Sequence, residues 1–377
     1  MTWRGNKATA GIILAVALII AYAAAQSFLV MAQDDVIVKG PGVSEIRMLG
    51  EYFSGLKNTA GDTEIYILRG PKPGGRALVL GGTHPNEPSG YMSAILLIEN
   101  ARPQVGELWV IPQSNLTGFT HNDAQEASPQ GFTIPTSWGE RYFRYGSRAT
   151  NPINQWPDPD IYIHASSGQR LSGSEVRNLN RAFPGRADGN LTEKIALGIT
   201  ELICQENIDL TIDLHEASPE YPVINAIVAH ERAMPMAASV AMNLQLDGIN
   251  IGLEPSPANL RGLTHRELGD HTDTLAILME TANPSQGRLR GRTDEALALT
   301  GKDDGYVKAA QLGRLFVPYD EGGHPLEERV GRHLTSINEF FIVYAEMYPE
   351  SPVTVEGIPL LWDIEKNGLG AYLLQPK

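Results

Sequence analysis

An imidazole and a carboxylate stand three positions apart directly after an apolar run of the sequence. The run, Ala77–Leu80, ends in two glycines, and His84 and Glu87 follow at once. Side chains three positions apart on one helical turn point the same way. Imidazole nitrogen and carboxylate oxygen suit Zn²⁺, and a catalytic zinc takes three protein ligands and leaves one position open. The pair predicts two ligands of a metal site, although this spacing also arises by chance, and a third ligand must come from elsewhere.

A second polar group closes another strand-like stretch. Residues 208–216 alternate apolar and polar positions, which places Asp213 and His215 on the same side of a strand. His215 is the candidate third ligand, and Asp213 could accept a hydrogen bond that orients it. Neighbouring parallel strands present their carboxyl ends at one edge of a sheet. Two such strand ends therefore favour a shared site more strongly than either does alone.

Together these motifs resemble the succinylglutamate desuccinylase and aspartoacylase group, a branch of the zinc carboxypeptidase superfamily. The likeness rests on His84-x-x-Glu87, on Asn180-Arg181 shortly before a Phe-Pro-Gly sequence, and on an Asp-Leu-His sequence that ends at His215. The resemblance implies that His84, Glu87 and His215 bind Zn²⁺. It also implies that Asn180 and Arg181 hold the carboxylate of a substrate.

The resemblance covers roughly residues 60 to 345 and supplies a candidate general base. The apolar strand predicted at Leu275–Thr281 carries Glu280 near its end and resembles the strand with the family's catalytic glutamate. A carboxylate beside a zinc-activated water can take its proton and later pass it to the leaving amine. The simpler alternative is that Glu280 is an ordinary residue at a strand end.

The arginines around the Asn-Arg pair leave one role open. Guanidinium groups suit carboxylates, and Arg177, four positions before Arg181, is a further candidate for substrate binding. Two surface arginines on a turn are the alternative. The family usually carries an additional upstream arginine that stabilises the oxyanion. Arg177 is closer to Arg181 than that pattern leads us to expect, so Arg148 and Arg170 are alternatives for this role.

Composition excludes several classes of protein. The chain has 377 residues and a formal net charge of −14, and it lacks a block of Lys and Arg. Nucleic acid is therefore not the expected partner, because phosphate binding needs clustered basic residues. The single cysteine, Cys204, rules out an intrachain disulfide and a thiolate zinc cluster. We expect it to be a structural core residue.

The beginning of the chain predicts export. Arg4 and Lys7 precede an apolar run over residues 10–32 that is interrupted only by Gln26 and Ser27. This order is typical of a signal peptide, and the run is also long enough for one membrane-spanning helix. Both alternatives place the rest of the chain outside the cytoplasm, as a secreted protein or one anchored through this segment.

The remaining pattern predicts an α/β fold. Strand, helix and strand are expected at residues 77–80, 91–101 and 108–111, as in a parallel βαβ unit. We therefore expect a zinc-carboxypeptidase-like, mixed and mostly parallel sheet with helices on both faces. The expected division of the chain is a signal or anchor at 1–33, a catalytic domain at 34–350 with an insertion lobe at 114–175, and a short β-like extension at 351–377.

These expectations lead to one main function and two alternatives. The main prediction is a zinc-dependent hydrolase that cleaves an amide bond in a small molecule or peptide bearing a carboxylate, as deacylases of this group do. The first alternative is an exported metallocarboxypeptidase that acts on peptides or cell-wall peptides. The second is an envelope binding protein that keeps the metal and the carboxylate contacts without turnover.

Overall fold

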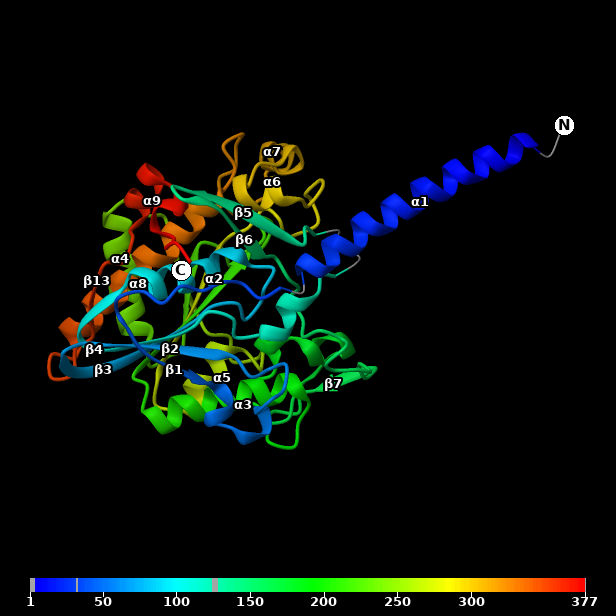
Figure 1. The fold of residues 1–377 in the computed structure, drawn as a ribbon. Coiled ribbons are helices and arrows are strands. Elements are labelled where there is room, and N and C mark those ends of the chain that lie inside the picture. Colours follow the sequence, from blue (N-terminus) through cyan, green and yellow to red (C-terminus); the bar gives the residue numbers. More distant parts are fainter. Residues whose placement is uncertain (1–3, 32, 124–127, 377) are drawn as a thin grey trace. The chain divides into compact units, whose positions relative to one another are not determined.

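The computed structural model describes residues 4–31, 33–123 and 128–376 (Figure 1). Residues 1–35 and 36–377 form two compact units. Within the first, helix α1 spans Arg4–Met31. Its segment Asn6–Met31 has a mean hydropathy of 2.3 and is long and apolar enough to cross a membrane. A signal sequence has the same properties, so both predictions for this segment stay open.

The second unit is built on a nine-stranded mixed sheet. The strand order is β1-β2-β4-β3-β9-β12-β10-β11, and β13 pairs with β4. The strands β4, β3, β9 and β12 run parallel in the centre. β1 and β2 continue the sheet in antiparallel pairs on one side, and β10 pairs antiparallel with β12 and parallel with β11 on the other. The strand bounds are β1 Val43–Met48, β2 Glu64–Arg69, β3 Lys72–Leu80, β4 Arg102–Ile111, β9 Leu210–Ala217, β10 Ala226–Ala229, β11 Gly252–Pro255, β12 Leu275–Ala282 and β13 Thr354–Glu356.

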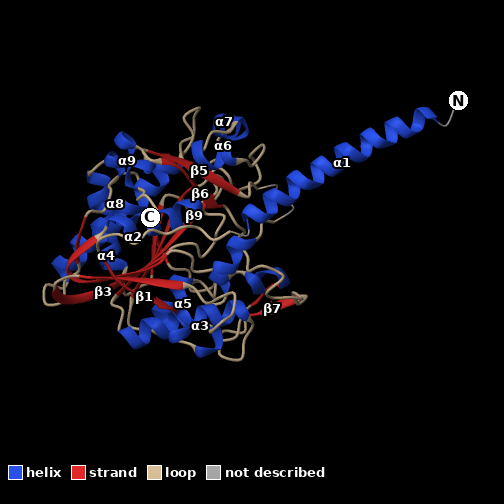
Figure 2. Cartoon of the chain, viewed as in Figure 1, coloured by secondary structure: helices blue, strands red, loops and turns tan. Residues whose placement is uncertain are grey.

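Helices cover both faces of this sheet (Figure 2). One face carries α2 (Pro88–Asn100), α4 (Met234–Leu246) and α8 (Leu326–Met347), and the other carries α3 (Leu191–Glu206) and α5 (Thr264–His271). The shorter helices are α6 Glu295–Thr300, α7 Asp304–Gln311 and α9 Leu361–Asn367. The 3₁₀ turns are η1 Leu49–Glu51, η2 Ser54–Leu56, η3 Leu116–Thr120, η4 Gly173–Arg177, η5 Leu179–Arg181 and η6 Leu369–Tyr372.

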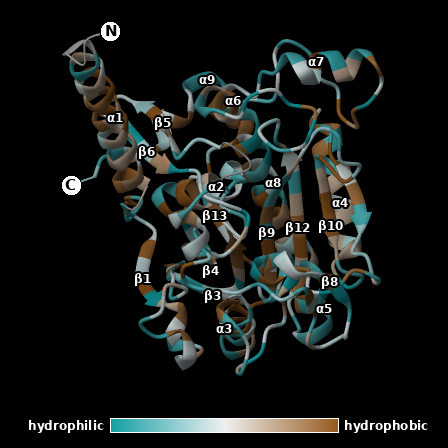
Figure 3. Cartoon of the chain, turned by 90° about the vertical axis from the view of Figure 1, so that its right-hand side faces the viewer, coloured by the Kyte–Doolittle hydropathy of each residue, from teal (hydrophilic) through white to brown (hydrophobic). Residues whose placement is uncertain are grey.

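Burial on both faces explains why the central strands are continuous apolar runs. Successive side chains of a strand point to opposite faces, and Leu78 joins the core beneath α3 whereas Val79 joins the core beneath α2 and α8. Figure 3 shows hydrophobic residues along β9, β12 and β10. The predicted α/β class with a mixed sheet and helices on both faces is confirmed.

Local sequence signals set the bounds of helix α3. The Asn190 side chain accepts a hydrogen bond from the Glu193 backbone at 3.0 Å, and the Glu193 carboxylate accepts one from the Asn190 backbone at 3.0 Å. This capping box satisfies two of the free N–H groups at the start of α3. Asn207, with φ 50°, ends the helix in the left-handed conformation that asparagine tolerates.

The stretch expected to form an insertion lobe is ordered and packed where it is described. It contains two hairpins, β5 (Gly131–Thr136) with β6 (Gly139–Arg144) and β7 (Ile161–Ile163) with β8 (Arg170–Ser172). Several of its aromatic side chains are buried, as Phe143 is at 0% exposure, whereas Trp156 is 70% exposed. Contacts place the whole of residues 36–377 in one compact unit. The division at residues 114–175 stays a prediction.

Two local expectations are wrong. The end of the chain, expected to be β-like near residues 358–362, has one three-residue strand, β13, followed by helix α9. The Asp363 carboxylate accepts a hydrogen bond from the backbone of Leu360 at 3.2 Å, which caps that helix. Cys204, expected in the core, is exposed, because it lies on the outward side of α3.

Candidate active site

The predicted site residues gather where β3, β9 and β12 end. Asp213 pairs with Leu80 of β3, and His215 pairs with Glu280 of β12. The loop after β3 carries His84 and ends at Glu87, which is the N-cap of α2. Parallel strands therefore bring the polar groups of three distant stretches to one edge of the sheet.

His84, Glu87 and His215 offer ligand atoms that all lie within 4.8 Å of one another. His84 Nδ1 lies 2.8 Å from Glu87 Oε1, and His215 Nδ1 lies 2.8 Å from Glu87 Oε2. The two imidazole rings meet edge to face, with centroids 4.6 Å apart. All three side chains are buried. A His-Glu-His set with converging Nδ1 and carboxylate atoms fits a divalent metal ion such as Zn²⁺.

Each imidazole also contacts a side-chain oxygen through its Nε2 atom. His215 Nε2 lies 2.8 Å from Asp213 Oδ2, as the sequence predicted, and Asp213 also accepts a hydrogen bond from Thr83 Oγ1 at 2.8 Å. His84 Nε2 lies 2.8 Å from Asn178 Oδ1. Such acceptors fix the tautomer and orientation of metal-binding histidines. Sequence reasoning missed Asn178, although it stands two positions before Asn180.

The protonation of the two histidines differs because their surroundings differ. Burial lowers the pKa of His84 to about 4, so its ring is neutral near pH 7 and able to bind a metal. Burial also disfavours the charged form of His215, but the carboxylates of Asp213 and Glu87 outweigh it and raise the pKa of that ring well above its usual value. Metal binding at His215 therefore displaces a proton.

Glu280 lines a cavity of about 480 Å³ together with the three ligand residues. Its Oε2 atom is buried and, within the described part of the chain, has no hydrogen-bond partner. Desolvation by the surrounding protein raises the pKa of its carboxyl group to about 8. A buried carboxyl atom without a partner, beside a set of metal-type ligands, is suited to exchanging a proton with a bound molecule.

Asn180 and Arg181 also line this cavity. The Asn180 side-chain oxygen accepts hydrogen bonds from the backbone of Thr264 at 2.8 Å and from its hydroxyl at 3.0 Å. Burial lowers the pKa of Arg181, which nevertheless stays charged near neutral pH. The two residues predicted to hold a carboxylate thus lie in the same cavity as the ligand set.

The structure places the other arginines differently. Arg177 does not line the cavity, because its guanidinium forms a two-pronged ion pair with Asp158 at 2.7 and 3.0 Å. Arg170 lies on β8 and is likewise absent from the described lining. Arg148 does line it, with Nη1 3.8 Å from Glu87 Oε1. Of the arginines considered for the oxyanion role, Arg148 is the one in position.

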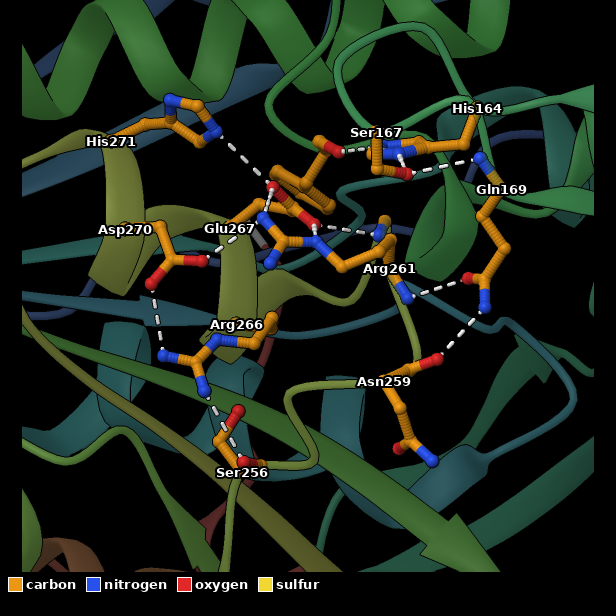
Figure 4. Close-up of polar contacts among 12 residues, drawn as sticks. His164, Ser167, Gln169, Ser256, Asn259, Arg261, Arg266, Glu267, Asp270 and His271 are labelled. Carbon is orange, nitrogen blue, oxygen red and sulfur yellow. Dashed lines mark hydrogen bonds and ion pairs between the residues drawn. The ribbon is translucent and has the colours of Figure 1, made fainter.

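A cluster of ion pairs around α5, the α5 network, fixes one wall of the cavity (Figure 4). Glu267 accepts hydrogen bonds from Arg261 at 2.7 and 2.8 Å and from the backbone of Gly262 at 2.9 Å. The Gln169 side chain accepts a hydrogen bond from the backbone N–H of Arg261 at 2.7 Å and donates one to the carbonyl of Asn259 at 2.8 Å. The other members are Arg266, Asp270 and His271. These contacts attach the segment of residues 255–263 to α5 and to Gln169.

Gly262 connects this wall to the segment that carries Asn180 and Arg181. Its φ is +82°, and a Cβ there would lie 2.2 Å from the carbonyl oxygen of Arg181. Its own carbonyl accepts a hydrogen bond from the backbone of Phe183 at 3.3 Å. Glycine is therefore needed both for the backbone conformation and for the close approach.

The fold and these side chains define an α/β protein with a buried His-Glu-His group of metal-binding type at the strand ends. No family model matches the chain. Among curated proteins, a segment of 65 residues is 37% identical to the N-alpha-acetyl-L-2,4-diaminobutyric acid deacetylase of Halomonas elongata. This segment is 17% of the present chain and 19% of that protein, so the match spans about a fifth of the relative.

Solved structures similar to the chain include the following three. The ectoine utilization protein EutE (DoeB) of Ruegeria pomeroyi is 19% identical, with 60% of this chain and 55% of that chain covered and a TM-score of 0.37. An aspartoacylase family protein of Mesorhizobium loti is 18% identical, with 62% and 64% covered and a TM-score of 0.36. A metallo-carboxypeptidase of Burkholderia cenocepacia is 11% identical, with 85% and 68% covered and a TM-score of 0.45. These similarities are too low to transfer a substrate, a metal or a mechanism to this chain.

Proposed function

We propose that this protein is a zinc-dependent hydrolase that cleaves an amide bond in a substrate bearing a carboxylate. The observation that carries the proposal is the position of Glu280. Its unpartnered Oε2 atom shares a cavity with three converging ligand residues whose rings are oriented by Asp213 and Asn178. When bound, zinc would polarise the scissile carbonyl and activate a water molecule.

The protein's own residues would perform the remaining work. Arg181 and the amide of Asn180 would hold the substrate carboxylate, which positions the scissile bond beside Glu280. Glu280 would take a proton from the attacking water and then donate it to the leaving nitrogen, a role suited to a carboxyl group whose pKa lies near neutrality. Arg148 would stabilise the negative charge that develops on the carbonyl oxygen.

Hydrolysis of an N-acyl amino acid, as by a deacylase, and release of a C-terminal amino acid, as by a carboxypeptidase, both fit this arrangement. In each reaction the released amino acid keeps a carboxylate that Arg181 can bind. The Halomonas elongata relative is named a deacetylase, and the Burkholderia cenocepacia structure is named a metallo-carboxypeptidase. We favour the deacylase, because the match to the deacetylase is 37% identical over its short segment, whereas the metallo-carboxypeptidase is 11% identical.

Action outside the cytoplasm is part of the proposal and depends on α1. The apolar segment Asn6–Met31 would serve as a signal sequence or as a membrane anchor. The substrate would then be an extracytoplasmic small molecule or peptide. Fractionation of cells, with immunodetection of the full-length and shortened chain, separates a cleaved signal from a retained anchor.

The decisive experiment combines metal analysis with a substrate screen. We expect one zinc ion per chain and hydrolysis of N-acyl amino acids, of short peptides, or of both. Glu280→Gln should keep the zinc and lower kcat by about 10²–10⁴-fold, the usual size of a general acid-base contribution. Zinc bound without turnover of any compound would favour the envelope binding protein, and unchanged turnover in Glu280→Gln would remove the assignment of this residue.

A further inference from the structure

The cavity at the candidate active site continues across the sheet beyond Glu280. Its floor there is a single row of three side chains that line the cavity: Leu278, Val228 and Glu254. Leu278 pairs with Val228 across β12 and β10, and Val228 pairs with Glu254 across β10 and β11. Neighbouring strands lie about 5 Å apart, so the row is roughly 10 Å long.

Strand alternation confirms that this row faces the cavity. Ile227 and Met279 enter the core on the other face of the sheet, beneath α4 and α8, and Leu253 packs against the same core. Each is the direct neighbour of a residue in the row. Because successive side chains point to opposite faces, Val228, Leu278 and Glu254 point away from that core.

The wall above this row is apolar and held in place. Pro257, Leu260 and Leu263 line it. They belong to the segment that Glu267 and Gln169 fix through Arg261, Gly262 and the Asn259 carbonyl (Figure 4). A wall whose conformation is already set loses little entropy when a ligand enters.

Glu254 is the charged end of this apolar passage. It is exposed, and its side chain forms neither an ion pair nor a hydrogen bond with the residues that the structure describes. Its Cα lies roughly 12 Å from that of Glu280, by two strand spacings and two residues along a strand. An aliphatic stem of four methylenes with a terminal ammonium spans about 6 Å, and an ion pair adds up to about 4 Å. A side chain of this length reaches from the scissile bond to Glu254.

We propose that this region binds a side chain with an aliphatic stem and a terminal cation, as in lysine, ornithine and related diamino acids. Leu278, Val228 and the apolar wall contact the methylenes, and Glu254 accepts the cation. The inference rests on the proposed function, since the side chain belongs to the amino acid whose amide bond is cleaved. Arg181 and Glu254 together would select an amino acid that carries a carboxylate at one end and a cation at the other.

A different role for Glu254 predicts a different result. The strand β11 is the last strand of the sheet order, and charged residues on such edges prevent unwanted pairing with other chains. In that case, substrate preference does not depend on residue 254.

The test uses the full-length, zinc-loaded protein and three leaving amino acids: lysine, norleucine and glutamate. Each is offered as its Nα-acetyl derivative and as an alanyl dipeptide. We expect kcat/KM for lysine to exceed that for norleucine by roughly fivefold, the size expected for an ion pair open to water. Glu254→Gln should bring this ratio close to one, and Glu254→Lys should shift the preference towards glutamate. Glu321→Gln removes a charge from an exposed residue outside the cavity lining and should leave the ratio unchanged.

The outcomes separate this inference from the function on which it rests. Hydrolysis with a lysine-to-norleucine ratio near one, or a ratio that Glu254→Gln does not alter, would overturn the inference and leave the hydrolase intact. If none of the compounds is hydrolysed, the proposed function fails for them, and binding of free lysine and norleucine is compared by calorimetry. Weaker binding of lysine in Glu254→Gln then supports the site, and equal binding in both proteins overturns it.

Discussion

Two clusters of charged side chains lie beside the same cavity wall and differ in how their charges are paired. In the α5 network, Glu267 is 0% exposed and forms an ion pair with Arg261. Its carboxylate also accepts a hydrogen bond from a backbone N–H and lies 3.2 Å from His271 Nε2. Arg266 is paired with both Glu231 and Asp270. Each carboxylate of this network has an arginine within 4 Å, although the buried Arg266 Nε atom has no hydrogen-bond partner within the described residues.

The cluster at the cavity is paired less completely. The Glu280 Oε2 atom has no hydrogen-bond partner within the described residues. Arg148 has 40% of its side chain exposed and approaches Glu87 only to 3.8 Å. Burying a polar group without a partner costs free energy, so such groups persist where a ligand completes them. The comparison supports the proposal that the cavity cluster binds a metal ion and a substrate, whereas the α5 network maintains structure.

The largest effect should come from removing a metal ligand. His215→Ala deletes one of three ligands, and we expect the zinc content of the purified protein to fall from one ion per chain to a small fraction, since three ligands are needed for a stable site. The matched change in the other cluster, His271→Ala, should leave zinc content unchanged. Elemental analysis after dialysis measures both. Equal zinc in the two variants would remove the distinction between the clusters.

A smaller loss of zinc binding should follow when a proposed ligand is kept but its hydrogen-bond acceptor is removed. Asn178→Ala removes the acceptor at 2.8 Å from His84 Nε2. We expect zinc affinity to fall by about 10–100-fold, as it does when such supporting groups are removed from other zinc sites. Competition with a chromophoric chelator measures the change. Unaltered affinity would show that the imidazole is oriented by packing alone.

Breaking the α5 network should affect stability and leave the metal in place. Arg261→Ala leaves the buried Glu267 with fewer partners, and we expect a loss of about 2 kcal/mol in the free energy of unfolding, between the values for exposed and buried pairs. Urea unfolding measures the loss, and Arg314→Ala, at an exposed position, is the control. If zinc content fell together with stability, the network would belong to the site.

The smallest effect concerns pH and another fully paired carboxylate, Glu328 of α8. Burial alone would raise its pKa, but hydrogen bonds from His324 at 3.1 Å and Arg332 at 2.9 Å hold it at about 2. This depressed pKa contributes stability above the ordinary value near 4.5, and the contribution disappears as the pH falls towards 2.

Glu328→Gln should therefore lower stability by on the order of 1 kcal/mol at pH 7 and by less as the pH falls below about 4. Chemical unfolding at several pH values measures the difference between the two proteins. A difference that is the same at all pH values would show that the carboxylate charge is not involved.

The sequence by itself determined the local chemistry and much of the secondary structure. His84, Glu87 and His215 were predicted as ligands because metal-ligand residue types at strand ends are a local pattern. The capping box and the stop of α3 are likewise encoded in adjacent residues. Periodicity and capping depend on neighbours along the chain, which the sequence lists directly.

Only the tertiary structure decided which polar groups meet across the sequence. Arg177 and Arg148 are the same residue type, yet Arg177 is paired with Asp158 outside the cavity, whereas Arg148 lines the cavity. Asn178 lies 94 positions from His84, and Glu254 enters the cavity only because β11 pairs with β10 and aligns it with Val228. Such contacts follow from strand order and register, which depend on the packing of the whole sheet and not on local spacing.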